Sequence, residues 1–127
     1  MNRLIQPSDV AAPAANYALA VLCDSPTKVL HTSGVVPTRL DASVPETLAD
    51  QAVVVWGTIV ALLAEAAMTA ADVVSVTTYV VDGQDLSVVM AARDLALGGH
   101  RAASTLIVVP RLARPEWLME IAVVASR

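Results

Sequence analysis

Residues 99–105, Gly-His-Arg-Ala-Ala-Ser-Thr, and residues 119–124, Met-Glu-Ile-Ala-Val-Val, decide the fold of this chain. Each stretch opens or lies in a run of small, apolar and β-branched residues, which favours a strand. We expect strands at about 102–109 and 117–125, joined by residues 110–115, Pro-Arg-Leu-Ala-Arg-Pro. The pair Gly98-Gly99 before them is typical of a helix end.

A helix, a strand and a second helix are predicted upstream of this pair. Residues 72–81 are rich in β-branched side chains and form the clearest strand, and residues 84–97 have apolar side chains at helical spacing. An apolar stripe over residues 48–66 predicts a long first helix, with Pro45 in its first turn and Asp50 near the positive end of its dipole. Val54, Gly57 and Ala61 lie largely off this stripe and are also uncharged, so the outer face of the helix is poorly suited to full exposure.

Two short β-prone runs, residues 17–22 and 28–33, come first, with the turn-forming residues 24–27 between them. We expect them to form a hairpin. The predicted order is therefore ββ-α-β-α-ββ in a single domain, residues 1–127, without repeats or linkers. A mixed β-sheet with two α-helices packed on one face accounts for that order, which is an α+β fold.

Composition excludes several classes of protein. The formal net charge of −4 argues against a nucleic-acid-binding surface, which needs a basic face. The longest apolar run, residues 52–64, is too short to span a bilayer, and the N-terminus lacks the apolar segment of a signal peptide. The single cysteine, Cys23, excludes a disulfide within the chain and fits a reducing compartment. We therefore expect a cytoplasmic protein that binds neither nucleic acid nor membrane.

The apolar content is high for so short a chain. Apolar residues make up 56% of it, yet there is no phenylalanine, so the core must consist of small aliphatic side chains. We expect part of this apolar surface to be buried between subunits of a homo-oligomer. A simple compositional preference for alanine and valine is the alternative.

Four segments in the right order, with the right gaps, resemble the RidA/YjgF (YER057c/UK114) family of small trimeric enamine/imine deaminases. Residues 12–21 resemble the opening strand of that family, residues 32–37 its Thr-Ser-Gly-Gln-x-Pro segment, residues 72–80 its central strand and residues 99–105 its penultimate strand. The resemblance covers essentially the whole chain. It implies a RidA/YjgF-like (chorismate-mutase-like) fold and a homotrimer with three small-molecule pockets at the subunit boundaries.

The resemblance also nominates pocket residues, namely Tyr17, Ser33, Gly34, Thr105 and Glu120. It implies that Glu120 positions or activates the water that attacks the imine carbon. We assign the catalytic roles to Glu120 and Thr105 on this basis. An ordinary carboxylate at the start of a strand, paired with an arginine across an interface, is the alternative interpretation of Glu120.

Three positions depart from the family pattern. Ala103 replaces the arginine that holds the substrate carboxylate, Arg101 stands where the family has proline, and Met90 replaces a helix asparagine that commonly faces the pocket. Side chains at i and i+2 of a strand share a face, so Arg101 is the candidate replacement for the missing cation, with a solvated arginine as the alternative. Trp117 is a candidate for the pocket mouth, with a packing role as the alternative.

The missing arginine bears directly on the activity. Loss of the buried partner of a carboxylate costs ~3–5 kcal/mol, so standard 2-aminoacrylate deaminase activity is expected to be weak or absent. Arg111 and Arg114 in the connecting loop either reach a neighbouring pocket or are surface charges. We also expect no metal and no cofactor, because the sequence has no histidine pair or second cysteine at ligand spacing and no glycine-rich phosphate loop.

We predict a divergent RidA-like enzyme that acts on an imine, enamine or related small carbonyl compound, less anionic or bulkier than 2-aminoacrylate. Its partners are then a small-molecule ligand and copies of itself. A non-catalytic trimer that binds a metabolite or a partner protein is the alternative. A chorismate-mutase-like enzyme ranks last, since that reaction needs several cations around a dicarboxylate.

Overall fold

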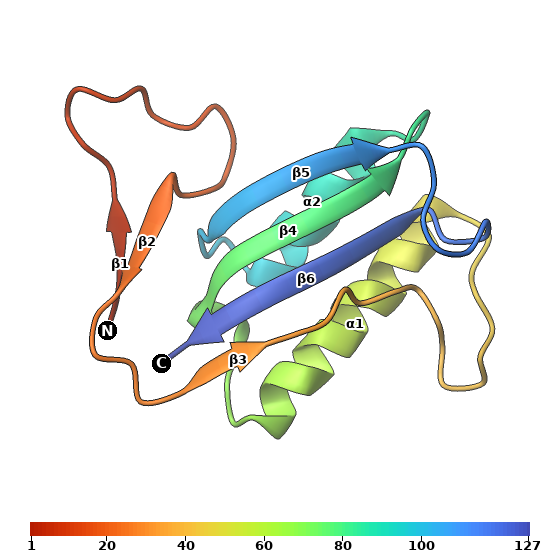
Figure 1. Cartoon of the computed structure of the whole chain (residues 1–127), viewed down its shortest axis with the longest axis horizontal. Coiled ribbons are helices and arrows are strands. Elements are labelled where there is room, and N and C mark those ends of the chain that lie inside the picture. The colour runs from red at the N-terminus through yellow and green to blue at the C-terminus, as the bar shows by residue number, and fades with distance from the viewer.

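Two helices cover one face of a four-stranded sheet (Figure 1). In the computed structural model, which describes residues 1–127, the strands lie in the order β3-β6-β4-β5. β4 pairs in parallel with β5 and antiparallel with β6, and β6 pairs antiparallel with β3. The predicted α+β class, with a mixed sheet and two helices on one face, is confirmed. The strand bounds are Val29–His31 for β3, Val73–Val81 for β4, Ala103–Val109 for β5 and Met119–Ser126 for β6.

The first helix, α1, spans Leu48–Glu65. Thr47 caps it, since its hydroxyl accepts a hydrogen bond from the backbone N–H of Asp50 at 3.2 Å. The prediction that Pro45 stands in the first turn is wrong, because the side-chain oxygen that satisfies the first free N–H groups belongs to Thr47. Asp50 does lie in the first turn, as predicted.

One face of α1 packs in the core of the domain. Its fully buried side chains include Val55, Ile59 and Leu63, which pack in one apolar cluster with Met119 and Ile121 of β6. By length and composition alone the helix could also cross a membrane, because its 18 residues are longer than the apolar run at residues 52–64 on which the sequence prediction was based. One face of the helix is buried in the apolar cluster, and its apolar outer face is left exposed.

The second helix, α2 (Leu86–Leu97), begins after Asp85 and ends at Gly98, which has a left-handed φ of +59°. The carboxylate of Asp85 accepts hydrogen bonds from the hydroxyl of Ser87 at 2.6 Å and from its N–H at 3.0 Å. These two bonds lower the pKa of Asp85 below its ordinary value of 3.8, and the bond from the Ser87 hydroxyl has the larger effect.

A titration of stability should reveal this cap. A carboxyl group with a lowered pKa in the folded state stabilises the fold above its unfolded pKa, and this contribution is lost as the pH falls through the folded pKa. We expect wild type to have a higher Tm than Asp85→Asn at pH 7, with a difference that shrinks as the pH falls below about 4. Asparagine can cap the helix in the same geometry, but it lacks the negative charge that favours the positive end of the helix dipole and does not titrate. Thermal denaturation from neutral to acidic pH measures the difference, and a constant gap over that range would contradict the assignment.

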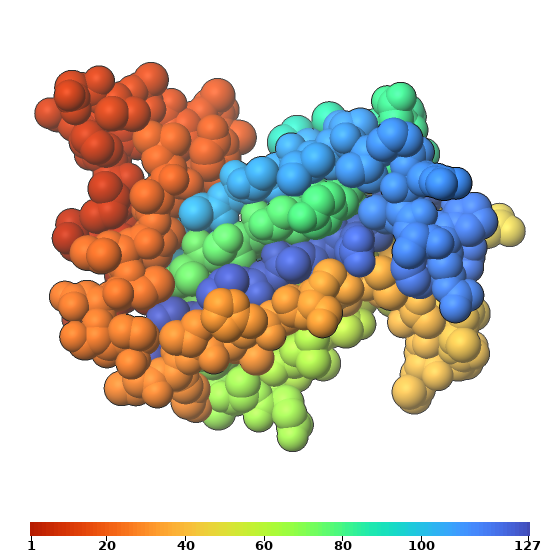
Figure 2. Space-filling view, viewed as in Figure 1, coloured from red at the N-terminus to blue at the C-terminus, as the bar shows by residue number.

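The N-terminal segment departs from the predicted hairpin. β2 (Ala20–Cys23) pairs antiparallel with an additional strand, β1 (Asn2–Ile5), whereas β3 pairs with β6. The chain does turn after β2, with Ser25 at a φ of +50°. However, the N–H of Thr27 then donates to the carbonyl of Arg127 at 2.7 Å, which directs β3 onto β6. The β1–β2 pair therefore stands apart from the main sheet (Figures 1 and 2).

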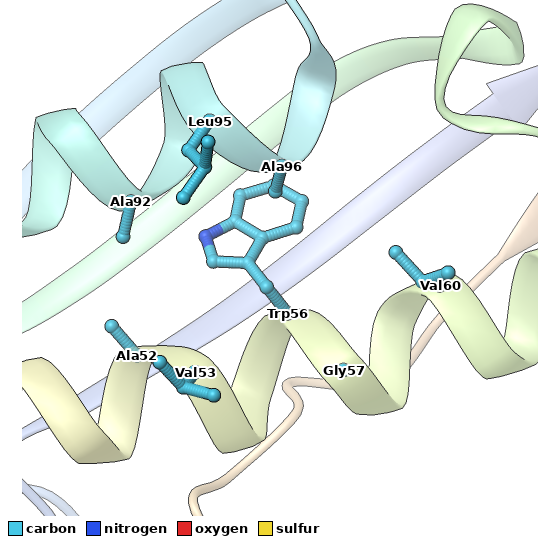
Figure 3. A pocket seen from close by; sticks show the side chains of 8 residues that line it. All are labelled: Ala52, Val53, Trp56, Gly57, Val60, Ala92, Leu95 and Ala96. Atoms are coloured by element: carbon cyan, nitrogen blue, oxygen red, sulfur yellow. The ribbon is translucent and has the colours of Figure 1, made fainter.

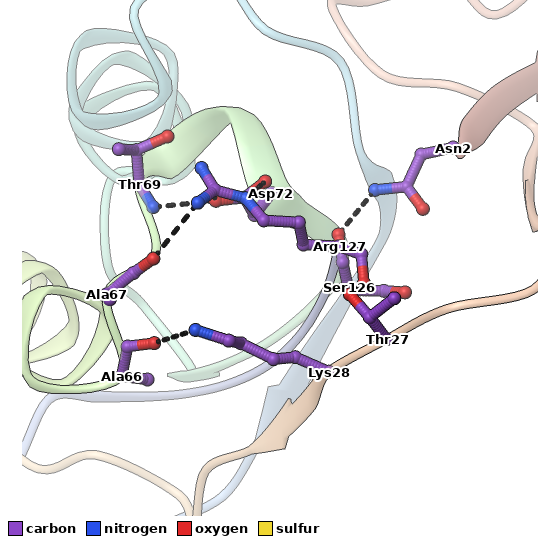
Figure 4. A network of polar contacts seen from close by, with 9 residues as sticks. All are labelled: Asn2, Thr27, Lys28, Ala66, Ala67, Thr69, Asp72, Ser126 and Arg127. Carbon is purple, nitrogen blue, oxygen red and sulfur yellow. Dashed lines mark hydrogen bonds and ion pairs between the residues drawn. The ribbon is translucent and has the colours of Figure 1, made fainter.

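Two cations bind the carbonyl groups just beyond the C-terminus of α1, whose last turn has no basic residue (Figure 4). Lys28 Nζ donates to the carbonyl of Ala66 at 3.0 Å, and the guanidinium of Arg127 donates to that of Ala67 at 3.1 Å. Arg127 also forms an ion pair of 3.1 Å with Asp72, which precedes β4. These contacts join α1 to the start of β3 and the end of β6.

Candidate functional site

The face of the sheet away from the helices is open (Figure 2). Along β4 and β6 the burial alternates, with the more deeply buried positions packed in the core beneath the helices. The intervening side chains are half-buried, and the register places them in three rows across the sheet. These rows are Val124, Ser75 and Ala103; Ala122, Thr77 and Thr105; and Glu120, Tyr79 and Ile107.

Glu120 lies at one end of this open face, against the backbone of Gly34. A Cβ atom at position 34 would come within 2.5 Å of Glu120 Oε1, so a larger residue there would force the Glu120 side chain to move. The next residue of each segment holds this contact in place, because Val35 and Ile121 exchange backbone hydrogen bonds of 2.7 and 3.1 Å. The structure thus brings together Gly34, Glu120 and the neighbouring Ser33, three of the predicted pocket residues.

The polar groups at this end are free to meet a ligand. The carboxylate of Glu120 forms no hydrogen bond or ion pair within the chain, and the backbone N–H groups of Ser33 and Gly34 have no acceptor within it. Ser33 and Gly34 are exposed and Glu120 is half-buried. A carboxylate beside two free N–H donors can accept a proton from water and bind an oxygen at the same time.

A second group of predicted residues gathers at the start of β5. The N–H of Ala18 donates to the carbonyl of Ala102 at 3.0 Å, which places Tyr17 beside this strand. Tyr17 and Arg101 line a hollow of about 130 Å³ with residues of the N-terminal segment. Arg101 is exposed and its Nε donates to Asn16 Oδ1 at 3.1 Å. Because β5 begins only at Ala103, the proposed i and i+2 alternation does not carry Arg101 onto the open face.

Within one chain the two groups lie far apart. Ala103 stands four residues before Ile107, which shares a row with Glu120 two strands away. Strand geometry therefore separates Ala103 from Glu120 by about 16 Å, and the exposed Thr105 from Glu120 by about 12 Å. A small substrate cannot contact both groups of the same chain.

The remaining predicted residues lie elsewhere. Met90 is exposed on α2, in the helix layer and so on the other side of the sheet from Glu120. Trp117 precedes β6 and lines a hollow of about 200 Å³, with the guanidinium of Arg114 5.7 Å from its ring centre. No group of three or more His, Cys, Asp or Glu side chains is placed to hold a metal ion.

Sequence reasoning missed Tyr79, which lies directly opposite Glu120 in the antiparallel pair. The signal was present, because Ser75, Thr77 and Tyr79 alternate with valine and threonine along the strand. Polar residues at i, i+2 and i+4 share one face of a strand. The phenol of Tyr79 is thus a further candidate contact for a ligand beside Glu120.

A family model described as Endoribonuclease L-PSP matches residues 8–127. The chain belongs to this family. Its members are also known as Rid or YjgF/YER057c/UK114 proteins. The RidA/YjgF resemblance drawn from the sequence is therefore confirmed, together with the fold that it implied.

Solved structures of Rid-family proteins resemble the chain over nearly its whole length. YyfB from Yersinia pestis, a Rid-family protein of unknown function, is 29% identical, with a TM-score of 0.87 over 99% of this chain and 98% of that chain. NMB1025 from Neisseria meningitidis is 27% identical, with a TM-score of 0.70 over 100% of this chain and 95% of that chain. TdcF from E. coli with bound serine is 19% identical, with a TM-score of 0.73 over 98% of both chains, and shows the fold alone. No curated protein matches the chain.

One buried side chain of this Rid-family protein holds the segments around Glu120 in place. Gln51 of α1 is 1% exposed. Its Nε2 donates to the carbonyls of Pro45 and Glu116, and its Oε1 accepts from the N–H of Leu118, each at 2.8 Å. Gln51 thereby fixes the loop that leads into β6, two residues before Glu120.

We expect Gln51→Leu to lower the free energy of unfolding by about 1–3 kcal/mol, because it leaves three buried backbone groups without the hydrogen bonds that the Gln51 amide makes. Equilibrium unfolding in urea measures this loss. Gln84→Leu is the matched control, since Gln84 is half-buried and its amide makes no hydrogen bond within the chain. Equal losses for the two variants would show that the three bonds of Gln51 contribute nothing specific.

Proposed function

We propose that this Rid-family protein is a homotrimeric hydrolase with small-molecule pockets between subunits. It acts on an imine, an enamine or a related small carbonyl compound, by attack of a water that Glu120 activates. The observation that carries this proposal is the free carboxylate of Glu120 beside the unbonded N–H groups of Ser33 and Gly34. The family to which the chain belongs supports a deaminase-like or small-molecule-binding role.

A second copy of the chain completes the proposed pocket. One chain separates the Glu120 group from the group of Tyr17, Ala103 and Thr105 by more than the length of a small substrate. The open face of the sheet leaves both groups accessible to a neighbour (Figure 2). Packing three copies in a ring sets the Glu120 group of each copy against the β5 group of the next.

The proposed reaction needs only water and proton transfer. Glu120 accepts a proton as the water oxygen bonds to the carbon of the protonated imine, and the electron pair of the C=N bond moves to nitrogen, which gives a neutral carbinolamine. The protonated Glu120 then returns its proton to the amino group. As the C–N bond breaks and ammonia leaves, the hydroxyl group of the carbinolamine gives its proton back to Glu120, and a carbonyl compound remains. An enamine enters the same route after protonation at carbon gives the imine.

The proposed substrate is less anionic or bulkier than 2-aminoacrylate. Alanine at position 103 offers no fork of N–H donors to a carboxylate, and the neighbouring open-face residues are Thr105 and Ile107. Arg101, bound to Asn16, remains the one cation near Tyr17. We do not propose a ribonuclease, because the net charge is −4 and the rows of the open face contain no lysine or arginine.

An imine-hydrolysis assay tests this function. An amino-acid oxidase generates imines in situ from alanine-like, leucine-like and aromatic amino acids, and hydrolysis is followed with and without the protein. We expect the protein to accelerate hydrolysis of the bulkier or aromatic imines. A trimer that turns over none of them, but is stabilised by small ligands in a thermal-shift screen, would instead support a non-catalytic binding protein.

A further inference from the structure

A groove runs between α1 and α2 on the surface that faces away from the sheet (Figure 3). Its volume is about 330 Å³. Small residues leave the space open, since a Cβ atom at Gly57 would meet no atom within 4 Å. Trp56 forms part of its wall and is itself buried. The lining consists of Ala52, Val53, Trp56, Gly57 and Val60 of α1 with Ala92, Leu95 and Ala96 of α2.

Large apolar side chains project beside this groove. Leu95 is 84% exposed, Val53 71% and Val60 47%. Residues 51–64 of α1 contain no charged side chain, so water covers an apolar face along most of the helix. Soluble monomers rarely leave a contiguous apolar patch of this kind uncovered, and such patches mark interaction surfaces.

We propose that this groove is a contact between two copies of the chain, related by a two-fold axis, with α1 of one copy over α2 of the other. A two-fold contact must be self-complementary, because the same surface meets itself. This surface presents a projecting side chain, Leu95 of α2, across one groove from Gly57 of α1, which has no side chain (Figure 3). Leu95 of each copy enters the groove of the other beside Gly57.

Charge does not oppose a second copy at this face. Each chain carries a net charge of −4, so copies repel one another over most of their surfaces. The groove lining has no charged group that would be desolvated or would face a like charge in a symmetric contact. The contact also leaves the open face of the sheet free, so it is compatible with a trimer and does not depend on the proposed activity. A three-fold ring joined through such contacts closes at six chains in its smallest form.

The mass of the assembly tests this inference. Native mass spectrometry and light scattering would compare wild type, Leu95→Glu and, as a second disrupting variant, Val53→Glu. Leu40→Glu is the matched control, because Leu40 is fully exposed and lies outside the groove. We expect wild type and Leu40→Glu to have twice the mass of Leu95→Glu and Val53→Glu, with circular dichroism unchanged.

Equal masses for all four proteins would overturn the inference. So would a wild type of the lower mass that co-sediments with neutral phospholipid vesicles through the same residues, since the groove would then meet a lipid surface. A wild-type mass that only Leu40→Glu reduces would place the contact elsewhere and would overturn it as well.

Discussion

Glu120→Gln is expected to lower the rate of imine hydrolysis by roughly 10²–10⁴-fold, the contribution typical of one general acid–base group. The amide has nearly the same shape but can neither accept the proton of the attacking water nor return it to nitrogen. The backbone around position 120 is held by the pairing of β6 with β4 and by the Val35–Ile121 bridge, neither of which uses the carboxylate. Steady-state kinetics on the best imine of the panel measures the effect in kcat.

Glu116→Gln serves as the control for this change. Glu116 is exposed in the loop before β6 and loses the same charge. We expect it to retain wild-type activity and the wild-type assembly mass. A Glu120→Gln variant as active as wild type would exclude Glu120 as the proton carrier and would remove the main support for the proposed reaction.

Ala103→Arg is expected to raise kcat/KM for imino acids by roughly two to three orders of magnitude. A buried carboxylate left without its arginine partner costs ~3–5 kcal/mol, and each tenfold change corresponds to about 1.4 kcal/mol. Ala103 is half-buried on the open face of β5, beside the backbone of Ala18. A side chain added there extends toward the neighbouring subunit in the proposed trimer.

The gain should depend on the carboxylate of the substrate. An imine without a carboxylate, produced by an amine oxidase, should show no gain with Ala103→Arg. Ala71→Arg adds the same charge at an exposed position and controls for general electrostatic attraction. Equal gains for both substrates, or none for imino acids, would show that position 103 does not face the carboxylate in this protein.

The regular elements of the C-terminal two-thirds could be predicted from local patterns. The apolar stripe over residues 48–66 predicted α1, and the β-branched run over residues 72–81 predicted β4. The strands predicted at about 102–109 and 117–125 match β5 and β6 within two residues. Periodicity determines these elements because each buries one face against a common core. The prediction of an N-terminal hairpin was wrong because β-propensity identifies a strand but not the strand that it pairs with. β3 pairs with β6 at the far end of the chain, and hydrogen bonds between Thr27 and Arg127 hold the two strands together.

The sequence by itself determined which chemical groups this protein has: a glutamate at position 120, alanine in place of arginine at position 103, and a helix without charged side chains over residues 51–64. The tertiary structure alone decided where they act. It set Glu120 over Gly34 and opposite Tyr79, separated it from Ala103, and opened the groove beside Leu95. The physical reason is that strand register and helix packing arise from contacts between residues far apart in the chain, whereas a local pattern fixes only the direction in which each side chain points.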